Sequence, residues 1–191
     1  MPAEVKILIE GWTNADSLEK GVDEENDACT TSLVRDGTII AVVDPGIMDD
    51  KNTLIDALKK EKLKLEDITH VFLTHSHIDH YRNVGMFPAK TPVVEYWGVW
   101  SGNRVDDWDD NFSQNFKIIK TPGHSYDGLT FLITTNSGKV AICGDVLWKE
   151  KIDQVDEYAV DQDELVVSRQ KVLEVADFVI PGHGKMFKVK K

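Results

Sequence analysis

The segment Thr74–His80 constrains this chain more than any other. Within six positions it holds four residues able to bind a metal: His75, His77, Asp79 and His80. It follows Ile68–Leu73, a short β-branched and apolar run that predicts a buried strand. Side chains two positions apart in an extended segment point the same way, so His75 and His77 can share one metal ion. Asp79 and His80 follow where the chain turns and can reach a neighbouring ion.

Imidazole nitrogen together with carboxylate oxygen is a ligand set suited to zinc, and also to iron or manganese. The alternative explanation of this segment is a solvated polar loop. A polar loop has no need of three histidines, so the metal interpretation is favoured.

Length and composition bound the class of protein. The chain has 191 residues, and we expect one domain over residues 1–191. No apolar run approaches the length that spans a bilayer, and Met1–Lys6 lacks the basic-then-apolar order of a secretory signal. Two cysteines, Cys29 and Cys143, do not make a disulfide framework. We therefore expect a cytoplasmic protein with no membrane partner.

The acidic charge balance disfavours a nucleic-acid substrate. The formal net charge is −11 at pH 7, and two divalent ions would change it only to −7 (−11 + 4). Either charge opposes long-range attraction of a polyanion. The Lys-rich tail Lys185–Lys191 is a small basic patch and is better explained as a solubilising terminus. We expect a small-molecule substrate, and a monomer or homodimer.

The hydrophobic pattern predicts strands and helices in an order that defines a fold class. Predicted strands cover Val5–Ile9, Thr30–Val34, Thr38–Val43, Ile68–Leu73, Thr91–Tyr96, Phe116–Lys120, Leu129–Thr134, Lys139–Cys143 and Asp177–Ile180. Predicted helices cover Asp49–Lys62, Asn83–Phe87 and Asp161–Ala176, the last with Leu165, Val172 and Val175 on its apolar side. This order fits an α/β (α+β) fold in which two sheets pack face to face with helices outside.

Two segments are predicted to be irregular. Gly11–Asp27 is polar and acidic, which predicts a long loop or a partly ordered flap. Gly98–Asn115 combines tryptophans with an acidic cluster. It is either a solvated loop with aromatic anchors or a wall of the substrate pocket.

Residues with metal-binding side chains recur where predicted strands end. They are His75, His124, Asp145 and His183, each in a turn that contains glycine or threonine. Ligands at strand ends on one edge of a sandwich can converge. Of the six histidines only His70 lies inside a predicted strand, and we expect it to be structural.

Four segments taken together resemble the metallo-β-lactamase superfamily. They are His75–His80, Thr121–Ser125, Cys143–Asp145 and Pro181–Gly184. Asp44 in Val43–Gly46 matches the turn that opens the superfamily pattern, and the resemblance covers nearly the whole chain. It is strongest to short, single-domain members, through Asn83–Pro88 and Ser168–Asp177. The resemblance implies a four-layer αββα sandwich with the site on one edge, between the sheets.

The resemblance also implies a role for each site residue. It assigns His75, His77 and His124 to a first metal, and Asp79, His80 and His183 to a second. Asp145 would bridge the two, and Asp44 would orient a histidine through its ring N–H. Two divalent ions, most simply zinc, would lower the pKa of a shared water and polarise a substrate oxygen. Asp79 would be both a ligand and the catalytic proton acceptor. Cys143 is expected to be buried filler.

The chain departs from the superfamily pattern beside the site. Many relatives have two glycines shortly after His80, where this chain has Tyr81, Arg82 and Asn83. Tyr81 and Arg82 either contact substrate or cover the start of the following helix. Tyr126 either donates a hydrogen bond to an oxyanion or packs.

The implied activity is hydrolysis of an ester, thioester, lactone or phosphodiester bond by metal-activated water. A metallo-β-lactamase proper would have a secretory signal and a cysteine at position 145. Glyoxalase II typically adds a helical domain, for which the eight residues after His183 are too few. Two alternatives stay open, a ribonuclease of this fold and an oxidoreductase resembling mononuclear-iron persulfide dioxygenases. The full ligand set argues against the second, because those enzymes use two histidines and one aspartate.

Overall fold

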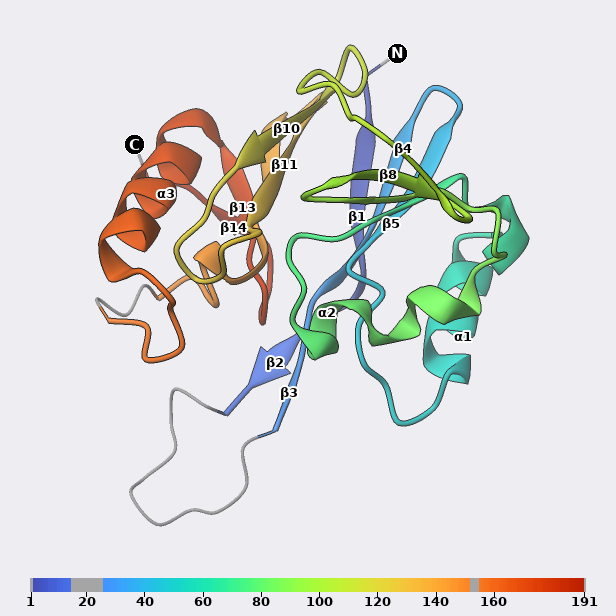
Figure 1. Cartoon of the computed structure of the whole chain (residues 1–191), viewed down its shortest axis with the longest axis horizontal. Coiled ribbons are helices and arrows are strands. Elements are labelled where there is room, and N and C mark those ends of the chain that lie inside the picture. The colour runs from blue at the N-terminus through green and yellow to red at the C-terminus, as the bar shows by residue number, and fades with distance from the viewer. Residues whose placement is uncertain (1, 15–25, 152–154, 191) are drawn as a thin grey trace.

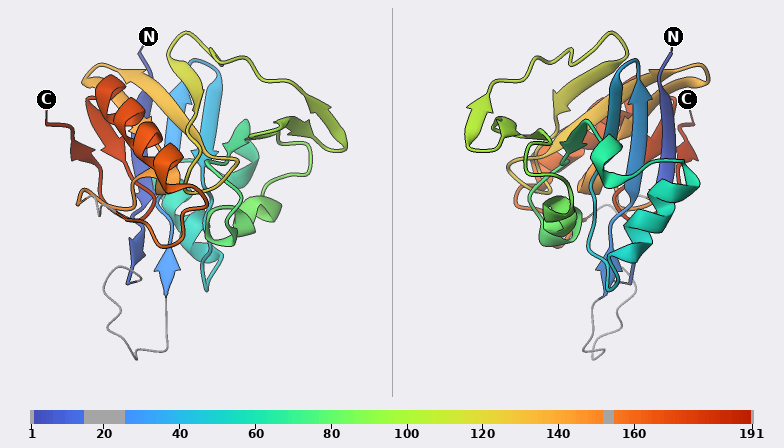
Figure 2. Two further views of the ribbon diagram at one scale, coloured as in Figure 1. Left: turned by 60° about the vertical axis from the view of Figure 1, so that its left-hand side comes forward. Right: turned by 90° about the vertical axis from the view of Figure 1, so that its right-hand side faces the viewer.

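A computed structural model of the chain describes residues 2–14, 26–151 and 155–190. Two β-sheets pack face to face, with helix α1 on the outer side of one and helix α3 on the outer side of the other (Figure 1 and Figure 2). The predicted αββα sandwich is therefore confirmed. None of the helices in these ranges is long and apolar enough to cross a membrane.

The first sheet has seven strands among the described residues, in the order β1-β4-β5-β6-β7-β8-β9. Their bounds are β1 Glu4–Ile9, β4 Thr31–Asp36, β5 Ile39–Val43, β6 His70–Phe72, β7 Val93–Glu95, β8 Gly98–Ser101 and β9 Arg104–Asp106. Strands β5 and β6 pair in parallel. The segments that follow them, which begin at Asp44 and Leu73, therefore leave the sheet at the same edge.

The second sheet has five described strands, in the order β10-β11-β12-β13-β14. Their bounds are β10 Phe116–Lys120, β11 Leu129–Thr135, β12 Gly138–Ile142, β13 Phe178–Ile180 and β14 Phe187–Lys188. Strand β11 is antiparallel to both β10 and β12, and β12 is parallel to β13. Strands β10, β12 and β13 thus run in one direction, and the turns after them meet at one edge.

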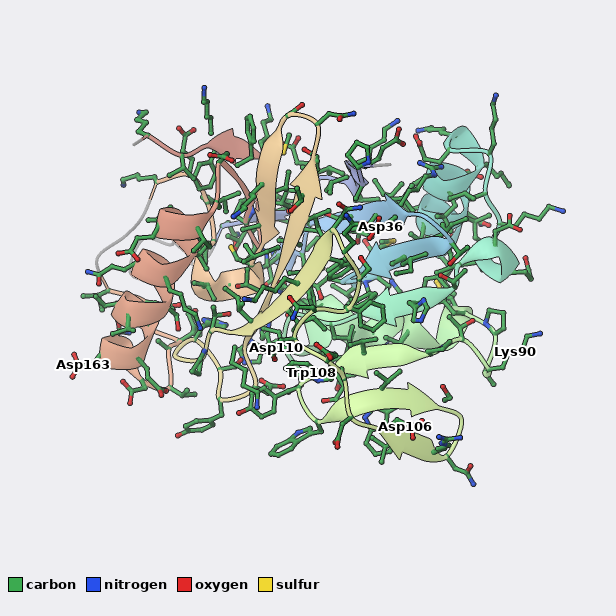
Figure 3. All side chains as sticks on the ribbon, turned by 90° about the horizontal axis from the view of Figure 1, so that it is seen from above. Asp36, Lys90, Asp106, Trp108, Asp110 and Asp163 are labelled. Carbon is green, nitrogen blue, oxygen red and sulfur yellow. The ribbon has the colours of Figure 1, made fainter. Side chains whose placement is uncertain are left out.

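Aromatic side chains fill the space between the sheets. The Phe72 ring of the first sheet stacks on Phe116 of the second, with ring centroids 4.6 Å apart, and meets Phe131 edge-on at 5.2 Å. All three are fully buried, and each such side chain stabilises the fold by about 1.5–3 kcal/mol. Figure 3 shows the side chains between the two sheets. Because Phe72 ends β6, its burial also fixes where the histidine-rich segment begins.

Two longer helices cover the sheets. Helix α1, Asn52–Lys60, buries Leu54, Ala57 and Leu58 against the first sheet. Helix α3, Gln162–Val175, begins after Asp161, whose side chain accepts a hydrogen bond from the Glu164 N–H at 2.9 Å. The remaining short elements are β2 Trp12–Thr13, β3 Asp27–Ala28, α2 Ile78–Tyr81 and the 3₁₀ turns η2 Leu65–Asp67, η3 Arg82–Met86 and η4 Gly144–Val146.

The buried face of α3 differs from the predicted one. Leu165 and Val172 are fully buried as expected, but Val175 is 37% exposed. Ser168 and Arg169 are buried instead, because they bond to loops of the second sheet. The Ser168 hydroxyl donates to the Pro122 carbonyl at 2.6 Å, and the Arg169 Nε–H donates to the Val146 carbonyl at 2.9 Å. Hydrophobic periodicity does not register a helix face that packs through polar side chains.

The prediction that 98–115 is irregular is wrong for its first half. Strands β8 and β9 form a hairpin that extends the first sheet, and Gly102 in its turn has a φ of +65°. Further along, the Trp108 indole N–H donates to the Glu95 carbonyl at 2.8 Å, so Trp108 is an aromatic anchor (Figure 3). Charged residues on the short, exposed strand β9 obscure the strand pattern.

The chain ends also differ from expectation. The Lys-rich tail is more than a solubilising terminus, because Phe187 packs on the second sheet and β14 pairs with β13. In the predicted loop at 11–27, β2 and β3 pair at its two ends. The rest of that loop, residues 15–25, lies outside the described residues.

Candidate metal centre

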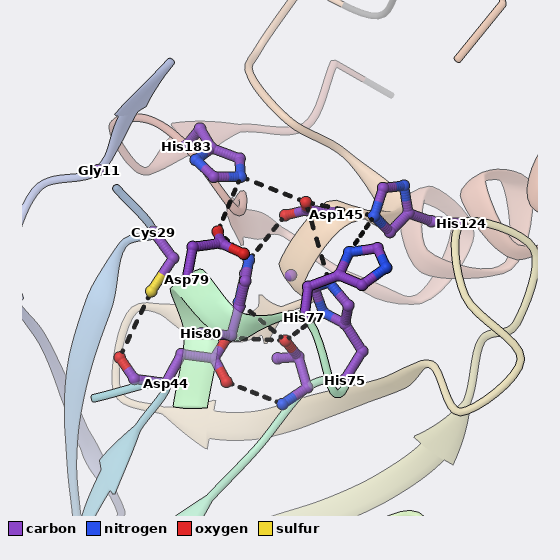
Figure 4. Close-up of polar contacts among 12 residues, drawn as sticks. Gly11, Cys29, Asp44, His75, His77, Asp79, His80, His124, Asp145 and His183 are labelled. Atoms are coloured by element: carbon purple, nitrogen blue, oxygen red, sulfur yellow. Dashed lines mark hydrogen bonds and ion pairs between the residues drawn. The ribbon is translucent and has the colours of Figure 1, made fainter. Parts of the chain in front are cut away.

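The site lies at the edge where the strands of both sheets end. Its members come from the turns after β5, β6, β10, β12 and β13. The structure brings together all seven side chains predicted as ligands (Figure 4), which are His75, His77, Asp79, His80, His124, Asp145 and His183. Their ligand atoms fall into two groups, and within each group every atom lies within 4.8 Å of the others.

Group one consists of His75, His77, His124 and Asp145. The Nε2 atom of His124 lies 3.0 Å from Nδ1 of His77 and 3.4 Å from Oδ2 of Asp145. The Nε2 atom of His75 lies 3.9 Å from the same carboxylate oxygen. His75 and His77 come from the first sheet, whereas His124 and Asp145 come from the second.

Group two consists of Asp79, His80 and His183. The Oδ2 atom of Asp79 lies 3.2 Å from Nε2 of His80 and 3.7 Å from Nε2 of His183. The His80 side chain is fully buried, while the Asp79 side chain keeps 13% of its surface exposed. Group two thus has a closed side at His80 and an open side at Asp79.

The Asp145 carboxylate lies between the two groups. Its Oδ1 is 3.2 Å from Nε2 of His80, and its Oδ2 is 3.2 Å from Nε2 of His183, both in group two. The same Oδ2 faces the histidines of group one (Figure 4). Gly182 makes room for it, because a Cβ at that position would come within 1.8 Å of Asp145 Oδ1.

Several atoms of the site are buried without a hydrogen-bond partner. Among the described residues, His75 Nε2, Asp79 Oδ2, His80 Nε2 and Asp145 Oδ1 share this property. A buried polar group left unpaired costs about 1–3 kcal/mol, so several that point at one another need a common partner. Imidazole nitrogens and carboxylate oxygens are cation ligands, and the residues present therefore fit metal ions.

Burial and charge set the protonation of the site. Burial would raise the pKa of the Asp145 carboxyl, but the nearby positive charges of His183 and His80 and the hydrogen bond from His183 hold it well below its usual value. Burial, reinforced by the charge of His80, lowers the pKa of His75 well below the ordinary value. Near neutral pH the carboxylate is therefore ionised and the His75 ring is neutral, which are the forms that bind metals.

Asp44 stands behind group two. Its Oδ2 lies 2.9 Å from Nδ1 of His80, as the predicted orienting role requires. Thr74 donates twice to the same carboxylate, from its backbone N–H at 2.8 Å and its hydroxyl at 2.7 Å. Asp44 has a φ of +48°, a conformation that non-glycine residues rarely adopt and that is often found at functional sites.

Sequence reasoning missed two residues beside group one. The Asp156 carboxylate lies 2.9 Å from Nδ1 of His124. The Trp148 ring lies near histidines of both groups, with centroid distances of 6.0 Å to His124 and 5.6 Å to His183. Neither residue stands in a motif or directly after a strand, so the sequence offers no signal that singles it out.

The other residues singled out from the sequence lie around this centre. Tyr81 is 38% exposed and Tyr126 is 74% exposed, and the Arg82 side chain is exposed as well. The interpretation of Tyr126 as a packing residue is therefore wrong. Cys143 is buried, and burial raises its pKa to about 12, which suits filler and not a metal ligand. His70 begins β6 and packs edge-on against Phe112, away from both groups, as a structural residue would.

Comparison with known proteins places this architecture in a family. Residues 25–99 match the model of the metallo-beta-lactamase superfamily. Metallo-beta-lactamase domain-containing protein 1 of Xenopus laevis is 28% identical over the whole chain and 83% of its own length. The protein of that name from Mus musculus is 30% identical over 96% of this chain and 74% of its own length. A crystal structure of an N-acyl homoserine lactone hydrolase superposes with a TM-score of 0.73 at 14% identity, over 95% of this chain and 92% of that one.

The fold and the site define a metal-dependent hydrolase. The chain belongs to the metallo-β-lactamase superfamily. Its similarity to metallo-beta-lactamase domain-containing protein 1 confirms the type of member that Asn83–Pro88 and Ser168–Asp177 predict.

Proposed function

We propose that this protein is a hydrolase that uses two divalent metal ions to cleave an ester, thioester or lactone bond in a small molecule. The observation that carries the proposal is the position of the Asp145 carboxylate, with Oδ1 toward His80 and Oδ2 toward His124 and His183. A carboxylate placed between two groups of ligands can join two ions, which a mononuclear site does not require. Zinc is the simplest choice for this ligand set, with iron or manganese as alternatives.

The side chains of the centre have two roles, metal binding and proton transfer. The buried histidines His75 and His80 hold the closed side of the centre, and their burial keeps bulk water away from it. His77 is half-buried and Asp79 is partly exposed, so substrate is expected to approach along these two residues. Two divalent ions bound here supply a Lewis acid and a water that ionises near neutral pH. The Asp79 carboxylate would help to hold the ion of group two, and at the open side of the centre it would orient that water and accept its proton.

The substrate class follows from charge and from similarity. A net charge of −11 repels polyanions, which weighs against the ribonuclease alternative. The lactone hydrolase with the same fold was crystallised with the product N-hexanoyl-L-homoserine bound at its catalytic metal centre. A small substrate with a carbonyl carbon as the point of attack is thus the best match, and a phosphodiester ranks below it. Cytoplasmic location belongs to the proposal, because two free, buried cysteines suit a reducing compartment.

The test is elemental analysis followed by a substrate panel. The purified protein should contain two metal ions per chain, and it should hydrolyse at least one of a thioester, a lactone and an aliphatic ester. A β-lactam and a phosphodiester complete the panel. Asp145→Asn should lose metal and activity together, whereas Asp163→Asn, an exposed aspartate on α3, should change neither. Wild-type protein that takes up no metal at neutral pH, or that oxidises a persulfide and hydrolyses nothing, would overturn the proposal.

A further inference from the structure

Asp156 makes a buried contact that the proposed function has not used. Its side chain is 4% exposed, and its Oδ2 lies 2.9 Å from Nδ1 of His124, whose side chain is also 4% exposed. An ionised carboxylate only accepts hydrogen bonds, so the Nδ1–H of His124 must be the donor. A ring that carries its proton on Nδ1 has its lone pair on Nε2, the nitrogen that faces Asp145 and His77.

Asp156 is itself held in one position. Its Oδ1 accepts a hydrogen bond from the Tyr158 backbone N–H at 3.0 Å, so both carboxylate oxygens have partners. Gln162 is the first residue of α3, and its side-chain amide makes two hydrogen bonds with the Asp156 backbone. Its Nε2 donates to the Asp156 carbonyl, and its Oε1 accepts from the Asp156 N–H at 3.4 Å. A carboxylate fixed in this way can dictate the orientation of the ring that it contacts.

The backbone of the same segment is tied to the loop that carries His124. The Val160 N–H donates to the His124 carbonyl at 3.3 Å, and the Asp161 N–H donates to the Gly123 carbonyl at 2.9 Å. Gly123 packs so closely on α3 that a Cβ there would lie 2.2 Å from the Leu165 nitrogen. These contacts hold the His124 loop against α3, and Asp156 adds a charged contact to them.

The arrangement matches the contact behind group two. There Asp44 Oδ2 lies 2.9 Å from Nδ1 of His80, and His80 also presents Nε2 to the centre. Each group therefore has one histidine whose far nitrogen is bonded to a buried carboxylate. Such a partner fixes the tautomer and the plane of the ring and makes the metal-facing nitrogen more basic.

We infer that Asp156 is the positioning residue of group one, which orients His124 and sets the affinity of that group for its metal ion. This inference rests on the proposed dinuclear site. It assigns a role in metal retention to 155–161, a segment that lies outside the family motifs in the sequence. Removing the carboxylate should weaken group one and leave group two loaded.

The first experiment compares zinc binding by wild type, Asp156→Asn and Asp163→Asn. Zinc affinity is measured by competition with a chromophoric chelator, and circular dichroism checks that each metal-free protein is folded. Asp156→Asn should lower the affinity for one of the two zinc ions about 10- to 100-fold, while the other stays bound. Asp163→Asn removes the same charge from an exposed position on α3 and should bind zinc as wild type does. Unchanged affinity for both ions in folded Asp156→Asn would overturn the inference.

A second measurement needs no substitution at Asp156. In zinc-loaded wild type, two-dimensional ¹⁵N–¹H spectra of the histidine rings should show the His124 proton on Nδ1, shifted downfield by the carboxylate and slow to exchange with water. A His124 ring protonated on Nε2 would overturn the inference even if the Asp156 variant does not fold. Failure of the proposed function is distinguishable, because it appears as wild-type protein that binds fewer than two zinc ions.

Discussion

The two ligand groups of the centre differ in how the fold supports them. Group two is backed by strand-end turns, with His80 fully buried and Asp44 bonded both to it and to Thr74. Group one contains the half-buried His77 and depends on a loop residue, Asp156, for the charged partner of His124. The difference suggests that group two is formed by the packing of the sheets, while group one also needs the segment before α3. The ion of group one should be the first to exchange.

Loss of the Asp145 carboxylate should lower zinc affinity more than any other change, since this carboxylate lies beside both groups. Asp145→Asn takes a ligand from group one and a neighbouring charge from His80 and His183 of group two. We expect more than about a 100-fold loss of zinc affinity, beyond what removal of a partner behind a ligand costs. Metal content after dialysis against a chelator measures it. Full retention of both ions would show that the carboxylate does not join the groups.

Replacement of Asp44 should reverse the order in which the ions leave. Asp44→Asn weakens the hold on His80, and we expect about a 10- to 100-fold loss at group two with group one intact. Stepwise chelation of this variant, set beside Asp156→Asn, shows whether the first ion released belongs to the same group in both. Identical release profiles would contradict the division into two separately supported groups.

A methyl group added beside the centre should weaken metal binding although no ligand is replaced. Gly182→Ala places a methyl group where it would meet Asp145 Oδ1 at 1.8 Å, so the carboxylate must move. We expect a loss of about 1–3 kcal/mol in the free energy of unfolding, together with weaker metal retention, measured by chemical denaturation and elemental analysis. Gly85→Ala is the matched control, because a Cβ at Gly85 has no neighbour within 4 Å. Equal behaviour of the two variants would show that Asp145 tolerates displacement.

The smallest expected effect is the reaction of the two cysteines with a thiol reagent. Both lie near the centre and outside both groups. Burial raises the pKa of Cys143 to about 12 and that of Cys29 well above its ordinary value. At pH 8 both buried thiols are therefore almost entirely protonated, so the folded protein should react very slowly with a thiol reagent. Both thiols should react at once in denaturant, and rapid reaction of the folded, metal-loaded protein would place a thiol on the open side of the site.

Much of the centre could be predicted because its ligands stand directly after apolar strands. His75 and His183 follow runs whose burial is plain from the sequence. Within each sheet, parallel pairing places the end of β6 beside that of β5 and the end of β13 beside that of β12. Asp156 could not be predicted, because it bonds across 32 residues to His124 and lies in an acidic stretch where nothing marks one carboxylate. Strand β9 escaped prediction because two of its three residues, Arg104 and Asp106, are charged and exposed.

The parallel strand pairs have a mechanical consequence. The first sheet contains the parallel pairs β5–β6 and β6–β7, and the second contains β12–β13. Each ligand group takes side chains from both sheets. A bound ion would therefore link the two sheets, and the chain could not unfold without releasing it. Binding energy of that kind adds to the stability of the folded chain in proportion to the logarithm of metal concentration. The melting temperature of this protein should thus report how fully its centre is loaded.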